Sequence, residues 1–408
     1  MPDHTLQSVL LLAEGSTLAH VGRPLLVARL LHNHGIRVTL ARPPAYSWMT
    51  RDEPFTVVDL HTQPPAEFAR RLDAGQPLYD LDTLEAYVTA DRALLSGLRP
   101  DVVVGDFRLS LSVSARLEGI PYATLCDAYW SPEAPLKPAL PVFPWTRFAP
   151  IQLAQAVFQR VAPLAFRVHA RPMERLRRRH GLGSLGHDLR LCYTDADLRL
   201  FANPRALFPK VHEHAGAAFI GPLAWSPAGE GELTALKQDG HPLVYVTMGS
   251  SGSPAVLAAL LPVLERFDCD IVLTTAGKPL PMGLDTGRAR IFDYLPGDRV
   301  CAQASLVICN GGSPTTNQAL SHGVPVLGIA RNMDQFLNMR AIEDFGAGLL
   351  MRADRVSPVL AATTLRALLT HPGFTQRARD LRYTEQGITA GTADSLVGHL
   401  TSLTGATG

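Results

Sequence analysis

The stretch LVICNGGSPTTNQAL, residues 306–320, runs from a short apolar segment through two glycines into a helical pattern. Gly311 and Gly312 let the backbone approach a ligand closely, while Ser313 and Pro314 are typical of the N-cap and N1 positions of a helix. The positive end of a helix and its unpaired N–H groups favour an anion. The pattern therefore predicts a diphosphate site, with a tight strand-to-helix turn and an ordinary cap as the alternative.

A second glycine-rich loop follows another apolar segment of the same half. Residues 243–247, LVYVT, precede MGSSGSP at 248–254, and a helical pattern follows. Loops at the carboxyl ends of parallel strands face one crevice in an open α/β sheet, so two such loops favour a phosphate site more than one does. Neither loop has the GxGxxG of a dinucleotide site or the lysine of a P-loop, which disfavours a nicotinamide oxidoreductase and an NTPase.

The N-terminal half shows the same alternation of strands and helices. Residues 9–13 form an apolar run, a helical pattern opens at Pro24 and stops at Gly35, and residues 36–40 alternate like a strand. The same order recurs over 102–125. Alternating strands and helices predict α/β domains with parallel sheets, so we expect two Rossmann-like domains.

Length and turn-forming residues suggest the division of the chain. Its 408 residues exceed the roughly 250–300 residues of a single core. We expect an N-terminal domain at 1–222, a linker at 223–232, a second domain at 233–385 and a final helix at 386–408 that packs back on the first domain. The proline-rich and amphipathic segment 135–180 is expected to pack in the core, with a membrane-surface helix as the alternative.

Composition disfavours several classes of protein. With 38 basic and 37 acidic side chains, the chain has no basic field for nucleic acid, and its basic run at 175–180 is typical of a solvated helix face. Five cysteines without CxxC spacing indicate neither a disulfide framework nor a zinc site. The sequence has no signal-peptide pattern and no run of about 18 apolar residues, so a cytoplasmic protein is expected.

Taken together, these motifs resemble the UDP-glycosyltransferase family with GT-B architecture, in particular glycosyltransferases of the bacterial macrolide and flavonoid type. The resemblance covers most of 240–350 through ARIFDYLP, CNGGSPTTNQALSHGVPVLGI and NMDQFLN, with shorter echoes at 9–40 and around 100–125. It implies transfer of a hexose from a UDP- or dTDP-sugar, with inversion, to a hydroxyl of a small hydrophobic or aromatic acceptor. No metal-carboxylate motif lies near the donor loops, so we expect neither metal nor cofactor.

The resemblance also implies donor-binding residues in the C-terminal half. They are Gly249, Ser250, Ser251, Tyr294, Leu295, Asn310, Gly311, Gly312, Ser313, Thr315, Thr316, Asp334 and Gln335. Tyr294 and Leu295 match positions at the base, and Asp334 and Gln335 match the pair that binds sugar hydroxyls, although Asp334 could also be a helix N-cap. Asn310 replaces the family's histidine, Pro314 a glycine and Gln318 an acidic residue. The diphosphate would therefore depend more on backbone N–H groups, and the nucleobase stays open.

In the N-terminal half, His20 matches the family histidine that removes the acceptor proton. An imidazole, with an unperturbed pKa of about 6.5, suits proton transfer near neutral pH. Asp106 matches the carboxylate that orients this imidazole, and Glu14 is a poorer candidate for the acid. A solvated capping residue is the alternative for His20, and a helix N-cap is the alternative for Asp106. Tyr129 and Trp130 are expected to line the acceptor pocket.

Three other readings of the same architecture stay open. A non-hydrolysing sugar-nucleotide epimerase would need carboxylates around the donor sugar and no acceptor. A catalytically weak nucleotide-sugar-binding protein would fit the replacements Asn310 and Pro314. A peripheral membrane transferase would act on a lipid.

Overall fold

The computed structural model describes residues 5–135, 137–226, 236–238, 240–249, 252, 254–382 and 385–405, with the backbone only for 254 and 385–392. Packing divides the chain into two compact units. Unit 1 comprises Met1–Leu136, Val161–Trp225 and Glu385–Gly408, and unit 2 comprises Lys137–Arg160 and Ser226–Thr384. Residues 137–160 were expected in the N-terminal domain, but they belong to unit 2. The Val142 N–H donates to the Arg331 carbonyl, and the Thr146 hydroxyl donates to Asp354. The expected linker lies partly outside the described residues.

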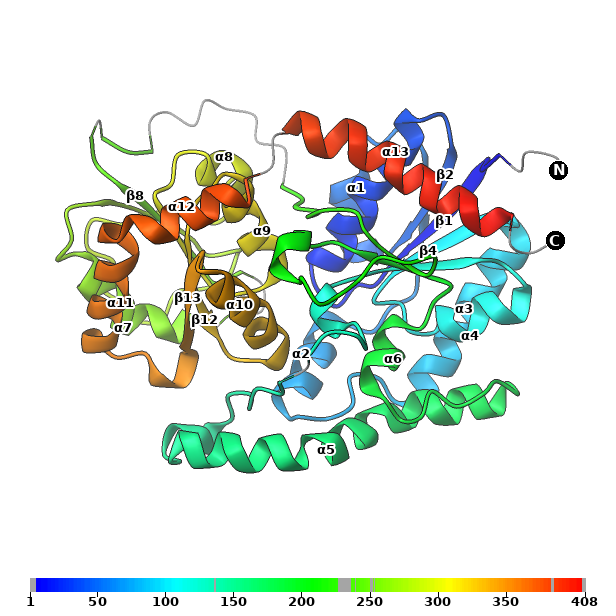
Figure 1. The fold of residues 1–408 in the computed structure, drawn as a ribbon, viewed down its shortest axis with the longest axis horizontal. Helices are drawn as coiled ribbons and strands as arrows, with labels where there is room; N and C mark the ends of the chain where they lie inside the picture. The colour runs from blue at the N-terminus through cyan, green and yellow to red at the C-terminus, as the bar shows by residue number, and fades with distance from the viewer. Residues whose placement is uncertain are drawn as a thin grey trace. The chain divides into compact units, whose positions relative to one another are not determined.

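Unit 1 is built on a seven-stranded parallel sheet in the order β3-β2-β1-β4-β5-β6-β7. Figure 1 labels β1, β2 and β4 of this sheet. The strands are β1 (Ser8–Ala13), β2 (Arg37–Arg42), β3 (Thr56–Asp59), β4 (Val102–Asp106), β5 (Tyr122–Cys126), β6 (Leu198–Phe201) and β7 (Ala217–Phe219). Strand β1 pairs in parallel with β2 on one side and with β4 on the other. Every residue of β1, β4 and β5 is buried, because helices cover both faces of the sheet.

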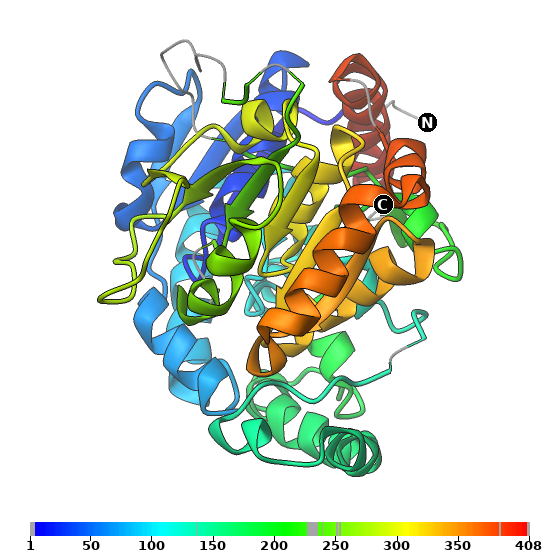
Figure 2. The same cartoon turned by 90° about the vertical axis from the view of Figure 1, so that its left-hand side faces the viewer.

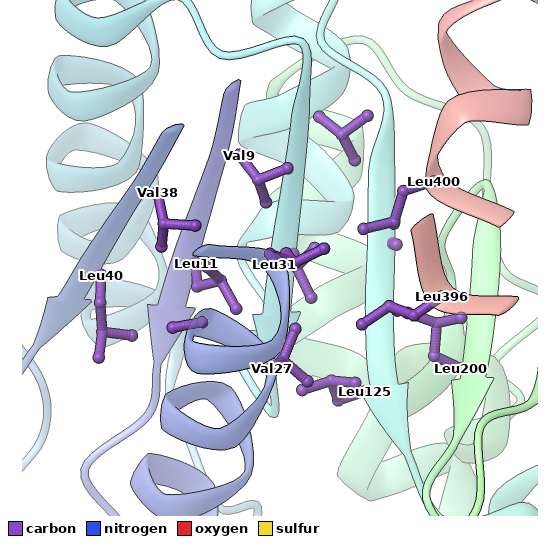
Figure 3. Close-up of a cluster of buried hydrophobic side chains, with 14 of the residues drawn as sticks. Val9, Leu11, Val27, Leu31, Val38, Leu40, Leu125, Leu200, Leu396 and Leu400 are labelled. Carbon is purple, nitrogen blue, oxygen red and sulfur yellow. The ribbon is translucent and has the colours of Figure 1, made fainter. Parts of the chain in front are cut away.

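Two helices cover each face of this sheet. They are α1 (Ala19–Asn33) and α13 (Glu385–Thr404) on one face, and α3 (Leu81–Leu98) and α4 (Leu111–Glu118) on the other. Figure 3 shows Leu31 of α1 in one core with Leu396 and Leu400 of α13. The C-terminal helix therefore completes the core of unit 1. The remaining short elements of unit 1 are η1 (Pro44–Thr50), α2 (Pro65–Asp73), η2 (Ala128–Trp130), α6 (Leu189–Thr194) and η4 (Arg205–Leu207).

The long helix α5 (Ile151–Arg179) follows the short turn η3 (Pro144–Arg147) and contributes residues to both units. Met173 and Leu176 of α5 pack in a core of unit 1. Upstream, the apolar side chains from Leu153 to Leu164 are largely exposed. The expectation that this segment packs in the core is wrong there, because helical spacing shows that residues share a face but not what covers it. Within the described residues, no helix is long and apolar enough to cross a bilayer.

Unit 2 holds a six-stranded parallel sheet in the order β10-β9-β8-β11-β12-β13. The strands are β8 (Leu243–Thr247), β9 (Asp270–Thr274), β10 (Arg290–Phe292), β11 (Leu306–Cys309), β12 (Val326–Ala330) and β13 (Gly348–Arg352). The helical elements are η5 (Pro254–Val256), α7 (Leu257–Leu264), α8 (Gly297–Cys301), α9 (Ser313–Ser321), α10 (Met333–Phe345), η6 (Ala353–Arg355), α11 (Pro358–Thr370) and α12 (Pro372–Asp380). Figure 2 shows α11, in orange, over the strands, where it shares a core with α7. The two parallel sheets confirm the predicted α/β class with two Rossmann-like domains.

Candidate functional sites

The first site lies where the carboxyl end of β4 meets the start of α1. Helix α1 begins at Ala19 rather than at Pro24, so His20 lies in its first turn and not in the preceding loop. The sequence rule for proline at N1 misplaced this start, because proline here is accommodated inside the helix. Asp106 is the last residue of β4, and its partner across the sheet is Ala13 of β1. Parallel pairing thus brings the end of β4 beneath the first turn of α1.

His20 and Asp106 are in direct contact. The Nδ1 atom of His20 lies 2.7 Å from Oδ1 of Asp106. Asp106 is fully buried, whereas the His20 side chain keeps 17% of its exposure. A neutral imidazole that donates its Nδ1 proton to the carboxylate has Nε2 as its proton acceptor. Because Asp106 remains within β4, its alternative role as a helix N-cap is wrong; Ser110 holds that position for α4.

Arg23 joins this pair from the same helix, one turn after His20. Its Nε donates to Oδ2 of Asp106 at 2.7 Å, and Nη2 donates to Oδ1 at 2.7 Å. The Nη1 atom donates to Asp127 at 2.9 Å, and Asp127 in turn accepts a bond from Asn203. Sequence reasoning missed Arg23, since arginine is usually a surface residue; its spacing of three from His20 was the available signal.

The charges around Asp106 determine its protonation. Burial acts to raise the pKa of the Asp106 carboxyl, but the charges and hydrogen bonds of Arg23 and His20 outweigh burial and hold this pKa below its usual value. Burial likewise acts to lower the pKa of Arg23, and the two carboxylates Asp106 and Asp127 raise it well above its usual value. The site therefore contains an ionised carboxylate that is paired on both oxygens.

Phe107 holds the other side of the imidazole. Its ring stacks on that of His20 with centroids 5.0 Å apart and an interplanar angle of 19°. The Phe107 backbone has φ of 55°, in the left-handed region that phenylalanine rarely adopts. Rings of Phe68, Tyr79 and Tyr193 surround it with centroids at 5.2–6.2 Å. Tertiary packing thus offsets a local strain of about 1–3 kcal/mol and fixes the plane of the catalytic candidate.

Tyr129 and Trp130 belong to η2, directly after β5, and both are buried. Trp130 packs edge-on against Tyr193 with centroids 5.0 Å apart, and Tyr193 contacts Phe107. A continuous series of aromatic rings therefore connects the expected acceptor residues with His20.

Glu14, the poorer candidate, is occupied elsewhere. It is fully buried and accepts hydrogen bonds from Tyr87 at 3.0 Å and from Arg108 at 3.2 Å. Arg108 also donates to Asp91, so Glu14 belongs to a buried ionic cluster distinct from the contact between His20 and Asp106.

The second site is the glycine-rich start of α9 in unit 2. The N-cap is Gly312, with Ser313 as the first helical residue, so the expected Ser313 cap is wrong by one position. The Gly312 N–H donates to Oδ1 of Asn310 at 3.1 Å, and Gly311 has φ of 82°. This Asn310 bond closes a local turn and lets the chain enter the helix without a side-chain cap.

Two further contacts connect the parts of this loop. A Cβ on Gly249 would lie 3.5 Å from the Asn310 amide nitrogen, so the two glycine-rich loops meet at Asn310. Nδ2 of Asn338 donates to the Gly311 carbonyl and to Oγ1 of Thr316, each at 2.9 Å. Sequence reasoning missed Asn338, which lies on α10 and stabilises the loop through these two bonds. Ser250 and Ser251, also expected at this site, lie outside the described residues.

Asp334 and Gln335 lie in the first turn of α10. The cap of this helix is Asn332, whose side chain accepts the Gln335 N–H at 3.0 Å, so the alternative N-cap role for Asp334 is wrong. The Gln335 side chain is buried and its Oε1 accepts the N–H of Arg331 at 2.9 Å. The Gln335 side chain thus stabilises the turn between β12 and α10.

Tyr294 and Leu295 lie between β10 and α8. Tyr294 is exposed, and its hydroxyl donates to the Ala276 carbonyl at 3.0 Å. Gly297 of α8 packs against the Gln318 side chain on α9, which links this segment to the helix that follows the glycine-rich loop. In the described part of the chain, no group of three histidine, cysteine or carboxylate side chains is arranged to hold a metal ion.

The chain is similar to known proteins over most of its length. The family model for the "Erythromycin biosynthesis protein CIII-like, C-terminal domain" matches residues 258–401. A PGL/p-HBAD biosynthesis glycosyltransferase of Mycobacterium tuberculosis is 41% identical over 377 residues, covering 92% of this chain and 88% of the relative. A PGL/p-HBAD biosynthesis rhamnosyltransferase of Mycobacterium bovis is 40% identical, covering 91% and 83%. The solved glycotransferase of kitacinnamycin shares the fold, with a TM-score of 0.71 at 20% identity, covering 96% and 98%.

Proposed function

Since the chain belongs to the family of GT-B glycosyltransferases that includes the PGL/p-HBAD biosynthesis enzymes, we propose that it transfers a hexose from a UDP- or dTDP-sugar to a hydroxyl of a small apolar or aromatic acceptor. We further propose that the anomeric carbon is inverted and that neither metal nor cofactor takes part. The contact of 2.7 Å between His20 and Asp106 carries this proposal, because it leaves Nε2 of a half-buried imidazole as the base.

In the proposed reaction, Nε2 of His20 accepts the proton of the acceptor hydroxyl as its oxygen attacks the anomeric carbon. A glycosidic bond forms, the bond from that carbon to the diphosphate oxygen breaks, and the nucleoside diphosphate leaves with the electron pair. Asp106 holds the Nδ1 proton and stabilises the imidazolium that results. Arg23 fixes the Asp106 carboxylate without supplying a proton.

The leaving diphosphate would be stabilised by the start of α9. The first-turn amides of Ser313 and Thr315 have no intrahelical acceptor, whereas Pro314 has no N–H to offer. Asn310 adds a side-chain amide and no positive charge. Backbone N–H groups and the helix dipole would therefore supply most of the stabilisation.

Aromatic packing supports an apolar or aromatic acceptor. The rings of Trp130, Tyr193 and Phe107 form one series that ends on His20. The names of the relatives place them in PGL/p-HBAD biosynthesis, and one of them is a rhamnosyltransferase. A deoxyhexose such as rhamnose on UDP or dTDP is accordingly the first donor to test, with phenolic compounds as the first acceptors.

The test pairs a panel of donors with a panel of phenolic acceptors and determines the anomeric configuration of the product by NMR. We expect the inverted glycoside, and we expect His20→Ala to lower kcat by about 10²–10⁴-fold, the usual contribution of a general base. The control His34→Gln changes an exposed histidine at the C-terminal end of α1 and should leave kcat unchanged. Retention of configuration, or full activity of His20→Ala, would contradict the mechanism; sugar epimerisation with donor alone would contradict the transfer.

A further inference from the structure

Helix α5 carries four large apolar side chains on one solvent-exposed face. Leu153, Val157, Val161 and Leu164 are 63%, 50%, 48% and 63% exposed. At 3.6 residues per turn, their spacing places them within an arc of about 80°. Single exposed apolar residues are common, but a contiguous row on one helix face marks an interaction surface.

The same face becomes basic towards the end of the helix. Its exposed arginines Arg160, Arg167, Arg171, Arg175 and Arg178 span an arc of about 80° that overlaps half of the apolar arc. Arg179, at the far edge of the apolar arc, is paired with Glu85 of α3. No aspartate or glutamate occurs from residue 151 to 173. The first acid, Glu174, accepts the backbone N–H groups of Leu185 and His187 and so does not neutralise this face.

The opposite face of α5 explains why the exposed row is not needed for folding. Ala162, Ala170, Met173 and Leu176 are buried, and the last three pack in the unit 1 core that also contains Tyr87. The helix is therefore already anchored by one face. Its other face has no packing role in the described part of the chain, as its exposure shows.

Two aromatic side chains directly before α5 extend the apolar surface. Trp145 and Phe148 are 53% and 85% exposed. Their backbone is held in place, because Arg355 donates to the carbonyls of Thr146 and Ala149. Tryptophan and phenylalanine beside a basic amphipathic helix are typical of segments that lie in the headgroup region of a membrane.

We propose that the exposed face of α5, together with Trp145 and Phe148, docks on an anionic membrane surface. Arginines without acidic neighbours complement anionic headgroups, and the apolar row enters the acyl boundary. A second copy of the chain would bury the same arginines, although the acids near this face are already engaged: Glu174 accepts two backbone N–H groups, and Glu85 pairs with Arg179 and His180. The docking surface is independent of the proposed transfer reaction.

The experiment measures flotation of the full chain with phosphatidylcholine vesicles and with mixed phosphatidylcholine–phosphatidylglycerol vesicles. We expect partition into the mixed vesicles that weakens as salt is raised. The variant Arg167→Gln, Arg171→Gln, Arg175→Gln should lower the partition coefficient by about 100-fold, or roughly fivefold for each arginine. Leu153→Asn with Leu164→Asn should lower it as well.

A matched control removes three exposed arginines elsewhere, by Arg70→Gln, Arg205→Gln and Arg288→Gln, and should keep wild-type partition. Melting curves and circular dichroism verify that each variant is folded. Absence of partition, equal partition of both arginine variants, or partition that ignores anionic lipid would overturn the proposal. So would wild-type self-association, measured by light scattering, that Leu153→Asn with Leu164→Asn abolishes, because the face would then join two copies of the chain.

Discussion

At the scale of single residues, Arg23 is central to the N-terminal site because it compensates two buried carboxylates, Asp106 and Asp127. Arg23→Met leaves both carboxylates without their cation, and loss of one partner of a buried ion pair costs about 3–5 kcal/mol. We expect a loss of unfolding free energy in this range, measured by urea denaturation. Arg29 lies on the same helix and is exposed, so Arg29→Gln, which breaks its pair with Glu53, should cost less, on the order of 1 kcal/mol.

An equal loss in the two variants would contradict the view that burial makes the Arg23 network special. The rescue variant Arg23→Lys restores the charge but not the bidentate geometry, so it should recover part of the stability and less of kcat. That separation between stability and kcat would show that Arg23 positions Asp106 as well as compensating its charge.

Asp106 should also affect the acid stability of the protein. Its folded-state pKa lies below the usual value, so the unfolded chain binds the proton first as pH falls. The stabilising contribution of Asp106 is therefore present above the unfolded pKa of about 4 and is lost as pH falls towards the folded pKa. Melting temperatures of the wild type and Asp106→Asn should differ most near neutral pH and converge below about pH 4.

Asp52→Asn is the matched control, because Asp52 is exposed, and it should follow the wild-type melting curve over the whole pH range. A difference between wild type and Asp106→Asn that stays constant down to acid pH would contradict the ionised, paired state of this carboxylate.

At the scale of elements, the strand-to-helix loops were predictable because glycine, serine and proline restrict the backbone locally. The strand before Asn310 and the helix after Gly312 lie where the sequence placed them. The starts of helices were predicted less accurately. Pro24 lies inside α1 instead of at its start, and Asn332 rather than Asp334 caps α10. Several residues near a start can cap a helix, and tertiary packing decides among them.

Residues that support the sites from other elements could not be found from the sequence. Asn338 lies on α10, and its bonds to Gly311 and Thr316 depend on how α10 packs behind the loop. The face of α5 was misread for a similar reason, since periodicity does not reveal which side of a helix the core covers. Whether the residues assigned by resemblance contact a donor stays a prediction.

Asn338 allows a test of the proposed donor-binding role of the glycine-rich loop before α9. Asn338→Ala removes both bonds and leaves the buried Thr316 hydroxyl and the Gly311 carbonyl with fewer partners. We expect the KM for the nucleotide sugar to rise by roughly 5- to 150-fold, as a loss of about 1–3 kcal/mol implies. The acceptor KM should change little. Asn317→Ala, on helix α9, is the control for removing a buried asparagine side chain near this loop, and it should raise the donor KM less than Asn338→Ala does.

A change confined to kcat, with an unchanged donor KM, would contradict a donor-binding role for this loop. Gly311→Ala offers an independent check, because φ of 82° and the Met339 side chain 2.6 Å from an added Cβ leave no room for alanine. It should weaken donor binding in the same direction as Asn338→Ala.

At the scale of the whole molecule, the chain returns to its first unit at its end. Leu396 and Leu400 of α13 complete the core around Leu31 and Val38, so the stability of unit 1 depends on a helix that follows unit 2 in the sequence (Figure 3). Unit 2 has a core of its own, formed by α7, α11 and its sheet. Two cores of this kind predict two thermal transitions rather than one.

Leu400→Ala assigns these transitions. Loss of a buried leucine side chain costs about 2–5 kcal/mol, which corresponds to a fall of roughly 4–20 °C in the melting temperature of a unit of this size. We expect calorimetry to show this fall in one transition only, while UDP or dTDP raises the other through binding to folded unit 2. Ser395→Ala, on the exposed side of α13, should move neither transition. If Leu400→Ala and the nucleotide instead shift one common transition, the two cores unfold together, and α13 stabilises the donor-binding unit as much as the unit it packs on.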